Sequence, residues 1–568
     1  MICQPNRIQE FLRSVLYSFE QKKVGEELWL FSSLFLIILI VLFYFVLSKQ
    51  GSWDSLKAKF TAAFFFLFII AALNIVHIPN YTRYSVHINE SQHIAEAQLL
   101  AKDFTFWKSV DGTTIGPLPL YYLAVFKGLG LNIDFLTIKM LNLLVWLFIF
   151  LSVFMIFRLT HNHSSSLLYT LPLITTVFYF QDGNFVGYNG EVLTVLLLCI
   201  SVYVIVILTK ETKQRKSLLF LSGIILVIIP FSKFQAGPIA FVMGLYVMWL
   251  VITRGWDFKP VISGVALPLI ILLGYLWYFN IVDDFWQSYI LNNAYYAAKG
   301  EGLDSNKGLL FNLAKLILIL FRGIETRMLV AISFVICLLL LAKSIMRYGW
   351  AASYCYVVSN KYLLFLLLFF FLSLFVIFVP GNAFLHYSIF IFVPLILLLG
   401  WVYHKLNSLY PSLFNAWAFI ILFVMIPSIN VSFGGHPAFD EITEQKLLDD
   451  NEIFDYLCSK ANPDDRMAVW GWESDLFAKT GIIMGTRESQ TQRQILSWKQ
   501  QEYYLERYLN DLETNKPRFF VDSTEKNSHL LNYETHNFKN FPVIKTYIDD
   551  NYEFVAYDDG MRLYERIK

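Results

Sequence analysis

Long apolar segments that recur along most of the chain are the feature that most constrains its fold. An α-helix needs about 20 apolar residues to cross the hydrocarbon core of a bilayer. Segments of this kind predict twelve spans, at 28–47, 58–78, 136–157, 166–180, 191–208, 218–232, 236–252, 260–279, 326–342, 362–379, 386–403 and 413–432. With 56% hydrophobic residues and a mean hydropathy of +0.52, the composition excludes an ordinary soluble domain and indicates a polytopic membrane protein.

Basic residues in short loops predict the orientation of the spans. The loop "TKETKQRKS" carries four basic residues and one Glu, and the loops at 253–259 and 342–362 agree with it. If these loops face the cytoplasm, alternation places the following segments outside: 79–135, 181–190, 233–235, 280–325, 380–385 and the tail after 432. The protein is then a multi-pass protein of the plasma (inner) membrane.

Two features complicate this topology. The apolar segments 118–130 and 309–321 are short, and we interpret them as interfacial or re-entrant helices; a crossing at 309–321 would invert everything that follows. The basic segment 1–27 should lie outside by parity, against the positive-inside rule, so a cytoplasmic or an interfacial position stays open for it. The predicted membrane domain covers 28–436, with the outer loop at 79–135.

A domain of different character follows the last span, at 437–568. The segment "AFDEITEQKLLDDNEIFDYLCSK" predicts an amphipathic helix, and "RMAVWGW" and "PRFFVDS" predict short buried strands. The segment "NYEFVAYDDGMRLYERI" predicts a hairpin that turns on Asp-Gly. The fold class is therefore an all-α membrane protein of about 12 or 13 transmembrane helices, with a soluble extracytoplasmic α/β domain at its C-terminus.

Polar residues of the membrane portion gather at the edges of the loops assigned to one face. Ionisable groups at membrane depth are energetically expensive, so their placement points to function. The group comprises Glu90 and His93 of the first outer loop, Asp182 and Glu191 around "QDGNFVGYNGE", Lys233 and Gln235 of "PFSKFQAGP", Asp283 and Asp284 of "NIVDDFWQSYI", and His386 and Tyr387 of "GNAFLHYS". This arrangement suits a site that is open to water and bordered by lipid.

These segments resemble the GT-C superfamily of membrane glycosyltransferases, near the aminoarabinose transferases and the dolichyl-phosphate-mannose protein mannosyltransferases. The resemblance rests on "INESQHIAEAQLL" after an early span, on the Pro-containing "GTTIGPLPLYYL" that follows, and on "YNGE", "FSKFQ" and "LHYS", and it covers about 58–403. It implies a GT-C membrane domain that moves a sugar from a polyprenyl-phosphate donor lipid to a lipid, glycan or protein acceptor. The family's Asp-Glu pair is Asn89-Glu90 here, which moves the predicted acidic role to Glu90.

The chemistry of such a transfer requires one base and one cation. An acceptor hydroxyl attacks the anomeric carbon, and a general base that takes its proton contributes roughly 10²–10⁴-fold. A cation must hold the charge of the leaving phosphate. One carboxylate acting opposite the leaving group predicts inversion of the anomeric configuration. Glu90 is the predicted base, with Glu191 as a second catalytic carboxylate.

Each of these acidic-loop residues also has a structural interpretation. Glu90 could instead be a carboxylate favoured by the dipole of a helix over 91–101, and Glu191 could belong to a structural ion pair. Asn89 either caps that helix or contacts substrate, and His93 lies one turn further along the same helix. Asp182 is a weaker candidate for substrate binding.

The donor phosphate is predicted to lie near Lys233, because a Lys is a natural phosphate ligand; a snorkelling interfacial Lys is the alternative. His386 and Tyr387 are predicted to contact the phosphate or the sugar, or else to belong to an interfacial aromatic belt. The remaining predicted substrate contacts lie beside Lys233 or on one helical face of "WQSYILNNAYY": Gln235, Tyr289, Asn292 and Tyr296. A lipid-facing belt would also explain the tyrosines.

A divalent metal, Mg or Mn, would take Glu90, His93 and Glu191 as ligands, although no ligand cluster of diagnostic spacing occurs. No other cofactor is implied, and a net charge of +1 does not suggest nucleic acid. Two other functions stay open. A transporter or flippase should show ionisable residues near helix centres and internal repeats. A ligase of cell-surface polysaccharide should carry a long Arg-rich outer loop.

Overall fold

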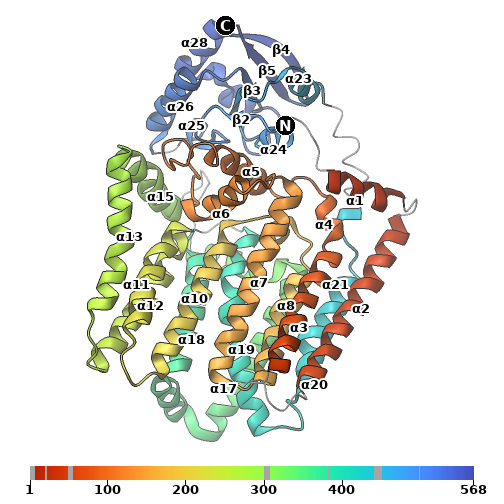
Figure 1. The fold of residues 1–568 in the computed structure, drawn as a ribbon, viewed down its shortest axis with the longest axis vertical. Coiled ribbons are helices and arrows are strands. Elements are labelled where there is room, and N and C mark those ends of the chain that lie inside the picture. The colour runs from red at the N-terminus through yellow and green to blue at the C-terminus, as the bar shows by residue number, and fades with distance from the viewer. Residues whose placement is uncertain are drawn as a thin grey trace.

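The protein is a bundle of long helices that carries an α/β domain at one end (Figure 1). The structure is a computed structural model that describes residues 7–18, 22–48, 56–299, 308–380, 384–439, 451–497 and 499–567. We refer to the residues of the α/β domain, 451–567, as the cap.

The bundle is built from helices whose apolar side chains pack against one another and face lipid outside. Its helices are α2 (Lys22–Ser48), α3 (Leu56–Val76), α7 (Phe135–Thr160), α8 (His163–Phe178), α10 (Gly190–Lys210), α11 (Lys216–Ile228), α12 (Gly237–Thr253), α13 (Lys259–Tyr278), α17 (Ile324–Ser359), α18 (Lys361–Phe378), α19 (Ile389–Leu409), and α20 (Ala416–Ile420) continued by η5 (Ile421–Met425) and α21 (Ile426–Ser432). Helix α19 is almost entirely buried, whereas α13 lies at the edge of the bundle and exposes most of its surface.

The predicted spans coincide with these helices. Within the described residues, eight helices are long and apolar enough to cross a membrane. The predicted spans 58–78, 218–232 and 413–432 coincide with shorter apolar helices, and 166–180 coincides with α8, which has 16 residues. The predicted all-α membrane fold is confirmed.

A layer of short elements lies between the bundle and the cap. It contains α1 (Arg7–Ser18), α4 (Ile78–Thr82), α5 (Ile88–Leu100), α6 (Pro117–Gly128), α9 (Gly183–Val186), η1 (Ile229–Phe231), η2 (Phe234–Ala236), α14 (Val282–Phe285), η3 (Trp286–Leu291), α15 (Asn292–Lys299) and η4 (Leu385–Ser388). Helices α5, α6 and α15 all lie at the end of the bundle that carries the cap (Figure 1). The loops that alternation assigned to one face therefore do meet at one end of the bundle.

Two of the segments that complicated the topology, 309–321 and the described part of 1–27, can be placed. Asn292 donates to the carbonyl of Thr113, and Glu325 accepts from the main-chain N–H groups of residues 181 and 182. Both ends of the stretch 292–325 thus lie in this layer, so α16 (Leu309–Arg322) makes no net crossing. Gln9 of α1 donates to the carbonyl of Tyr81 at 2.9 Å, which places α1 at the same end of the bundle.

The cap is built on a five-stranded mixed sheet of order β2-β1-β3-β5-β4. Its strands are β1 (Arg466–Trp470), β2 (Ile483–Met484), β3 (Phe519–Asp522), β4 (Tyr552–Asp558) and β5 (Met561–Arg566). Strand β1 runs parallel to β2 and β3, and β5 is antiparallel to β3 and β4. The predicted strands and hairpin are confirmed: Asp559 and Gly560 have φ of 48° and 71°, as a tight hairpin turn requires.

Helices surround the sheet. They are α23 (Glu452–Lys460), α24 (Asp475–Thr480), α25 (Gln492–Ile495), α26 (Gln501–Asn515), α27 (Tyr533–His536), η6 (Phe538–Asn540) and α28 (Pro542–Asn551). Helix α23 corresponds to the end of the predicted amphipathic helix, whose residues 440–450 lie outside the described part of the chain. Helix α24 packs against α5 of the layer below, so the cap and the layer form one continuous structure.

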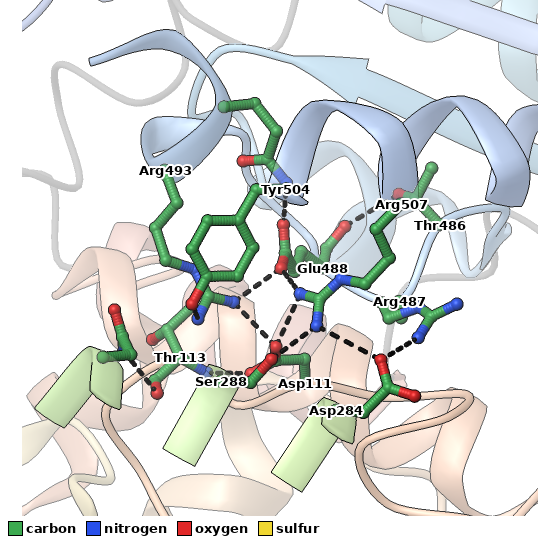
Figure 2. Close-up of polar contacts among 12 residues, drawn as sticks. Asp111, Thr113, Asp284, Ser288, Thr486, Arg487, Glu488, Arg493, Tyr504 and Arg507 are labelled. Carbon is green, nitrogen blue, oxygen red and sulfur yellow. Dashed lines mark hydrogen bonds and ion pairs between the residues drawn. The ribbon is translucent and has the colours of Figure 1, made fainter. Parts of the chain in front are cut away.

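A buried ion network joins the cap to that layer (Figure 2). Asp111 forms ion pairs with Arg493 at 2.9 Å and with Arg507 at 2.6 Å, and Glu488 forms ion pairs with both guanidinium groups. Burial raises the pKa of Asp111, but the charges of Arg493 and Arg507 outweigh this effect and lower the pKa to about 2. Two buried carboxylates thus balance two buried guanidinium groups, which is the condition under which such a network is tolerated.

A second set of contacts at the same junction centres on Arg487. Its guanidinium lies 3.0 Å from Asp284 of α14 and 2.8 Å from Asp511 of α26. The main chain contributes as well, because the N–H of Asp111 donates to the carbonyl of Arg487 at 2.8 Å. The cap is therefore held in one position over the loops 103–116 and 280–291, a position that no single segment of the sequence indicates.

Candidate functional site

The loop that ends at Gly116 holds Lys233 in place. Ile115 forms a β-bridge with Lys233, and Gly116 donates its N–H to the carbonyl of Ser232 at 3.1 Å. A Cβ on Gly116 would lie 2.0 Å from the carbonyl oxygen of Phe231, so only glycine permits this approach. Helix α6 begins at the next residue, Pro117, where the fixed φ of proline favours the start of a helix.

Three charged or titratable side chains from distant segments meet beside this bridge. Glu191 lies in the first turn of α10, Lys233 between η1 and η2, and His386 in η4. Glu191 Oε1 is 3.0 Å from Lys233 Nζ and 3.9 Å from His386 Nε2. Glu191 is 1% and Lys233 8% exposed, so the lysine does not snorkel and that alternative is wrong. We call Glu191, Lys233 and His386 the Glu191 cluster.

Polar and aromatic groups hold the cluster from its sides. His386 Nδ1 lies 3.2 Å from the amide oxygen of Asn184. Lys233 Nζ stands 6.0 Å from the ring centroid of Tyr387, whose hydroxyl is 2.6 Å from that of Tyr296. Both tyrosines are buried, so neither belongs to a lipid-facing belt, and both lie beside the Glu191 cluster.

Helix α5 closes the cluster on the side of the cap. The ring of His87 lies 5.3 Å from the ring of His386, and Asn89 donates to the side-chain oxygen of Asn189 at 3.3 Å. His87, not Asn89, is the N-cap of α5, so the capping interpretation of Asn89 is wrong. The predicted start of this helix at 91 is also wrong, because it begins at Ile88.

His93 faces the interior from the second turn of α5. Its ring packs 5.9 Å from Tyr188, and its Nδ1 is buried without a hydrogen bond to any described residue. Burial lowers the pKa of His93 to about 3, and Lys233 adds to this effect. A neutral imidazole with an unsatisfied nitrogen beside a charged cluster suits a polar ligand better than a packed core.

Glu90 has a different environment from the one predicted for a base. It is fully buried in the first turn of α5, its Oε1 lies 3.3 Å from Lys139 Nζ, and its Oε2 accepts from the main-chain N–H of Val86. Burial raises the pKa of Glu90, and Lys139 opposes this effect. Because Lys139 also donates to the carbonyls of residues 83, 84 and 135, the pair ties the loop before α5 to α7.

The other predicted site residues lie outside the cluster. Asp182 caps α9 by accepting from the N–H of Asn184. Gln235 donates to a carbonyl of α18, and Tyr289 donates to a carbonyl of η1. Asn292 donates to the loop 111–116. These contacts are within the protein and give residues 235, 289 and 292 structural roles, and the substrate contacts predicted at these positions stay predictions. The helical face predicted for 289–296 is interrupted because residues 286–291 form a π-helix.

Several residues of the site were missed by the sequence reasoning. Lys139 was the clearest omission, because a charged residue inside a predicted span signals a partner. His87 and Asn184 carried only a weak signal, their proximity to predicted residues. No group of three or more His, Cys, Asp or Glu side chains that could hold a metal comes together in the described part of the chain. Glu90 is paired with Lys139, and the suggested Glu90–His93 metal site stays a prediction.

The fold defines a class of protein: a polytopic membrane bundle whose loops converge under an extramembrane α/β cap. No protein-family model and no curated protein matches the sequence. Among solved structures, ArnT from Cupriavidus metallidurans bound to undecaprenyl phosphate superposes with a TM-score of 0.55 at 10% identity, over 88% of this chain and 97% of ArnT. Its apo state gives 0.51 at 11% identity, over 89% and 98%.

A third structure is more distant. The oligosaccharyltransferase AglB from Archaeoglobus fulgidus, in complex with an inhibitory peptide and a dolichol-phosphate, has a TM-score of 0.37 at 11% identity, over 89% of this chain and 75% of AglB. ArnT and AglB are both members of the GT-C superfamily. The similarity to ArnT covers 88% of this chain, so the predicted fold, a helical membrane domain with a C-terminal α/β domain, is confirmed.

Proposed function

We propose that this protein is a membrane glycosyltransferase that moves a sugar from a polyprenyl-phosphate donor to an acceptor hydroxyl with inversion. The observation that carries the proposal is the Glu191 cluster, a buried carboxylate, ammonium and imidazole brought together from three distant segments. ArnT, an aminoarabinose transferase, shares the fold and was solved with undecaprenyl phosphate bound. The fold supports the class of reaction, and the cluster supplies the groups that the reaction needs.

Lys233 is the proposed ligand of the donor phosphate, with His386 and Tyr387 beside it. A Lys holds phosphate as a point charge, and a buried one does so with little screening by water. Lys233 has an ion-pair partner, Glu191, at 3.0 Å. We expect an exchange of partners: the donor phosphate takes over the lysine, and the carboxylate of Glu191 is released to accept a proton.

Glu191 is thereby the better candidate for the base than Glu90, which the sequence favoured. Both oxygens of Glu90 face groups of the protein itself, Lys139 and the N–H of Val86. In the proposed step the acceptor oxygen forms a bond to the anomeric carbon as the bond from that carbon to the phosphate oxygen breaks. The hydroxyl proton passes to Glu191, and polyprenyl phosphate leaves as an anion whose charge Lys233 holds. No metal is needed for this balance.

The proposal includes a location. Basic loops at 209–217, 253–259 and 342–362 lie on the opposite end of the bundle from the cap, which supports a plasma-membrane protein with its site and cap on the extracytoplasmic side. Labelling of single cysteines placed in the cap, with an impermeant maleimide on intact cells, tests this directly. Labelling only after the cells are opened would contradict the orientation.

The activity is tested with purified full-length protein and a panel of radiolabelled hexoses and pentoses linked to undecaprenyl phosphate. We expect Glu191→Gln to lower kcat by about 100-fold or more with donor affinity retained. We expect Lys233→Ala to weaken binding of undecaprenyl phosphate about tenfold or more, while Lys127→Ala, at the end of α6, has no effect. Undiminished turnover in Glu191→Gln would remove the assigned base, and no transfer from any donor would refute the function.

A further inference from the structure

A cavity of about 470 Å³ lies between the cap and the loop that precedes α5. The layer contributes residues 84–88, and the cap contributes the loops around 472–476 and 526–529 and the turn of the β4–β5 hairpin. Its volume falls in the range of roughly 300–1,000 Å³ that is usual for small-molecule sites. None of the residues of the Glu191 cluster lines it, so it is a separate feature.

The cavity lies where the topology of the sheet favours a ligand site. The loops 471–475 and 523–527 follow the carboxyl ends of β1 and β3, which are parallel neighbours. After β1 the chain continues to β2, which lies on one side of the β1–β3 pair. After β3 it continues to β4 and β5, which lie on the other side. Open sheets with parallel strands bind ligands in the crevice outside the carboxyl ends, at the point where the strand order reverses.

The loop after β1 is rigidly held. Gly471 has a φ of 118°, and a Cβ there would lie 2.3 Å from the hydroxyl of Ser523. The side chain of Asn527 accepts from the N–H of Trp472 at 2.6 Å and donates to its carbonyl at 3.2 Å. The two strand ends are therefore clamped together, and the side chains between them are positioned before any ligand arrives.

The lining side chains have the chemistry of a polar site rather than of a domain junction. Glu473 and Asp475 lie in it with Lys479 and Lys526, and Lys526 pairs with Glu473 at 3.5 Å. Burial raises the pKa of Glu473 to about 7. A partly compensated carboxylate that lines a cavity is a group to which the hydroxyls of a ligand would donate hydrogen bonds.

One residue connects this cavity to the Glu191 cluster. His87 lines the cavity, and its ring lies 5.3 Å from the ring of His386. His386 in turn approaches Glu191. A ligand held against His87 from the cap side would thus lie next to the groups that we assign to sugar transfer, on the side opposite the membrane.

We infer that this cavity binds the acceptor, and that the acceptor is a saccharide whose hydroxyl reaches the Glu191 cluster past His87. The inference rests on the proposed function and specifies its second substrate. Carboxylates and amides accept hydrogen bonds from sugar hydroxyls, and Trp472 offers a flat apolar face beside them. A peptide acceptor would pair with a strand edge, yet neither edge strand, β2 or β4, lines the cavity.

The test uses the full-length protein in lipid nanodiscs, the donor found active in the panel, and the glycan and protein fractions of a cell-envelope extract as acceptors. We expect Glu473→Gln and Lys479→Ala to raise the acceptor KM about tenfold or more, with the donor KM and the rate of donor hydrolysis unchanged. Lys479 forms no ion pair within 4 Å in the described part of the chain, and its charge acts on Glu473 from a greater distance. Lys545→Ala, in an exposed pair on α28, is the matched control.

Each outcome separates the two proposals. An unchanged acceptor KM in both variants would overturn the cavity assignment while leaving the proposed function intact, and label that enters protein would overturn the saccharide. Failure of all transfer by the wild type would refute the proposed function. In that case saturation-transfer NMR with the envelope oligosaccharides, recorded without donor, still tests the cavity: wild type should give a signal that Glu473→Gln loses, and no signal from wild type would overturn the inference.

Discussion

Replacement of Asp111 by Asn should loosen the junction between the cap and the membrane body. The change removes one of two carboxylates that compensate Arg493 and Arg507, and it leaves the shape of the side chain nearly unaltered. A pKa near 2, against an ordinary 3.8, means that ionised Asp111 stabilises the closed junction by about 2 kcal/mol, since one pKa unit is worth about 1.4 kcal/mol. Breaking one partner of a buried pair typically destabilises by about 3–5 kcal/mol.

Hydrogen exchange measures this loss directly, because the N–H of Asp111 donates to the carbonyl of Arg487 across the junction. If the junction opens locally, the exchange rate of the peptides at 105–115 and 485–495 follows the population of the open state. A loss of 2 kcal/mol corresponds to an increase of about 30-fold, and 4 kcal/mol to nearly 1,000-fold. Asp549→Asn, in the exposed pair on α28, should leave these peptides unchanged. An increase of less than about threefold in Asp111→Asn would refute the reasoning.

Three further predictions concern stability. Glu90→Gln leaves the buried Lys139 ammonium without its carboxylate partner and should reduce stability by about 3–5 kcal/mol. The double variant with Lys139→Met should recover most of this stability. Equal thermal unfolding of Glu90→Gln and wild type in detergent would contradict the structural role of the pair. Gly116→Ala should abolish folding or transfer, because its Cβ would lie 2.0 Å from a main-chain oxygen, while Gly128→Ala, which meets nothing within 4 Å, should behave as wild type in yield and transfer. Burial raises the pKa of Glu473 to about 7 from 4.5, so protonated Glu473 stabilises the fold fully below its pKa in the unfolded chain, and this stabilisation is lost as pH rises through 7. The loss amounts to about 3 kcal/mol. Denaturation of wild type between about pH 5 and 8 should show this loss and that of Glu473→Gln should not, whereas identical pH profiles would count against this environment.

The sequence by itself determined the class of fold, because the signals for it are local. A span is recognised from some 20 neighbouring residues, and the hairpin from Asp559 and Gly560 between two short strands. Gly116 and Pro117 mark the start of α6 in the same way. Such features depend on the backbone preferences and hydropathy of adjacent residues, so they could be predicted before the helices were arranged in space.

The partners of the charged residues were decided only by the tertiary structure. Glu90, Glu191 and Lys233 all had to be interpreted singly, because the sequence shows that a buried charge needs a partner but not which one. The packing of α5 against α7 places Glu90 within ion-pair distance of Lys139, 49 positions away, and the β-bridge at Ile115 helps to place Lys233 beside Glu191. Contacts at such separation follow from how whole elements pack, which no local pattern encodes.

The cavity between the cap and residues 84–88 depends on the same level of organisation. The sequence predicted β1 and β3 as strands but not their order in the sheet, and the cavity exists only because they are neighbours with their carboxyl ends turned toward residues 84–88. Hydropathy therefore determined where the chain crosses the membrane. The packing of cap on bundle determined which polar groups meet, because that packing alone brings segments hundreds of residues apart to within reach of one substrate.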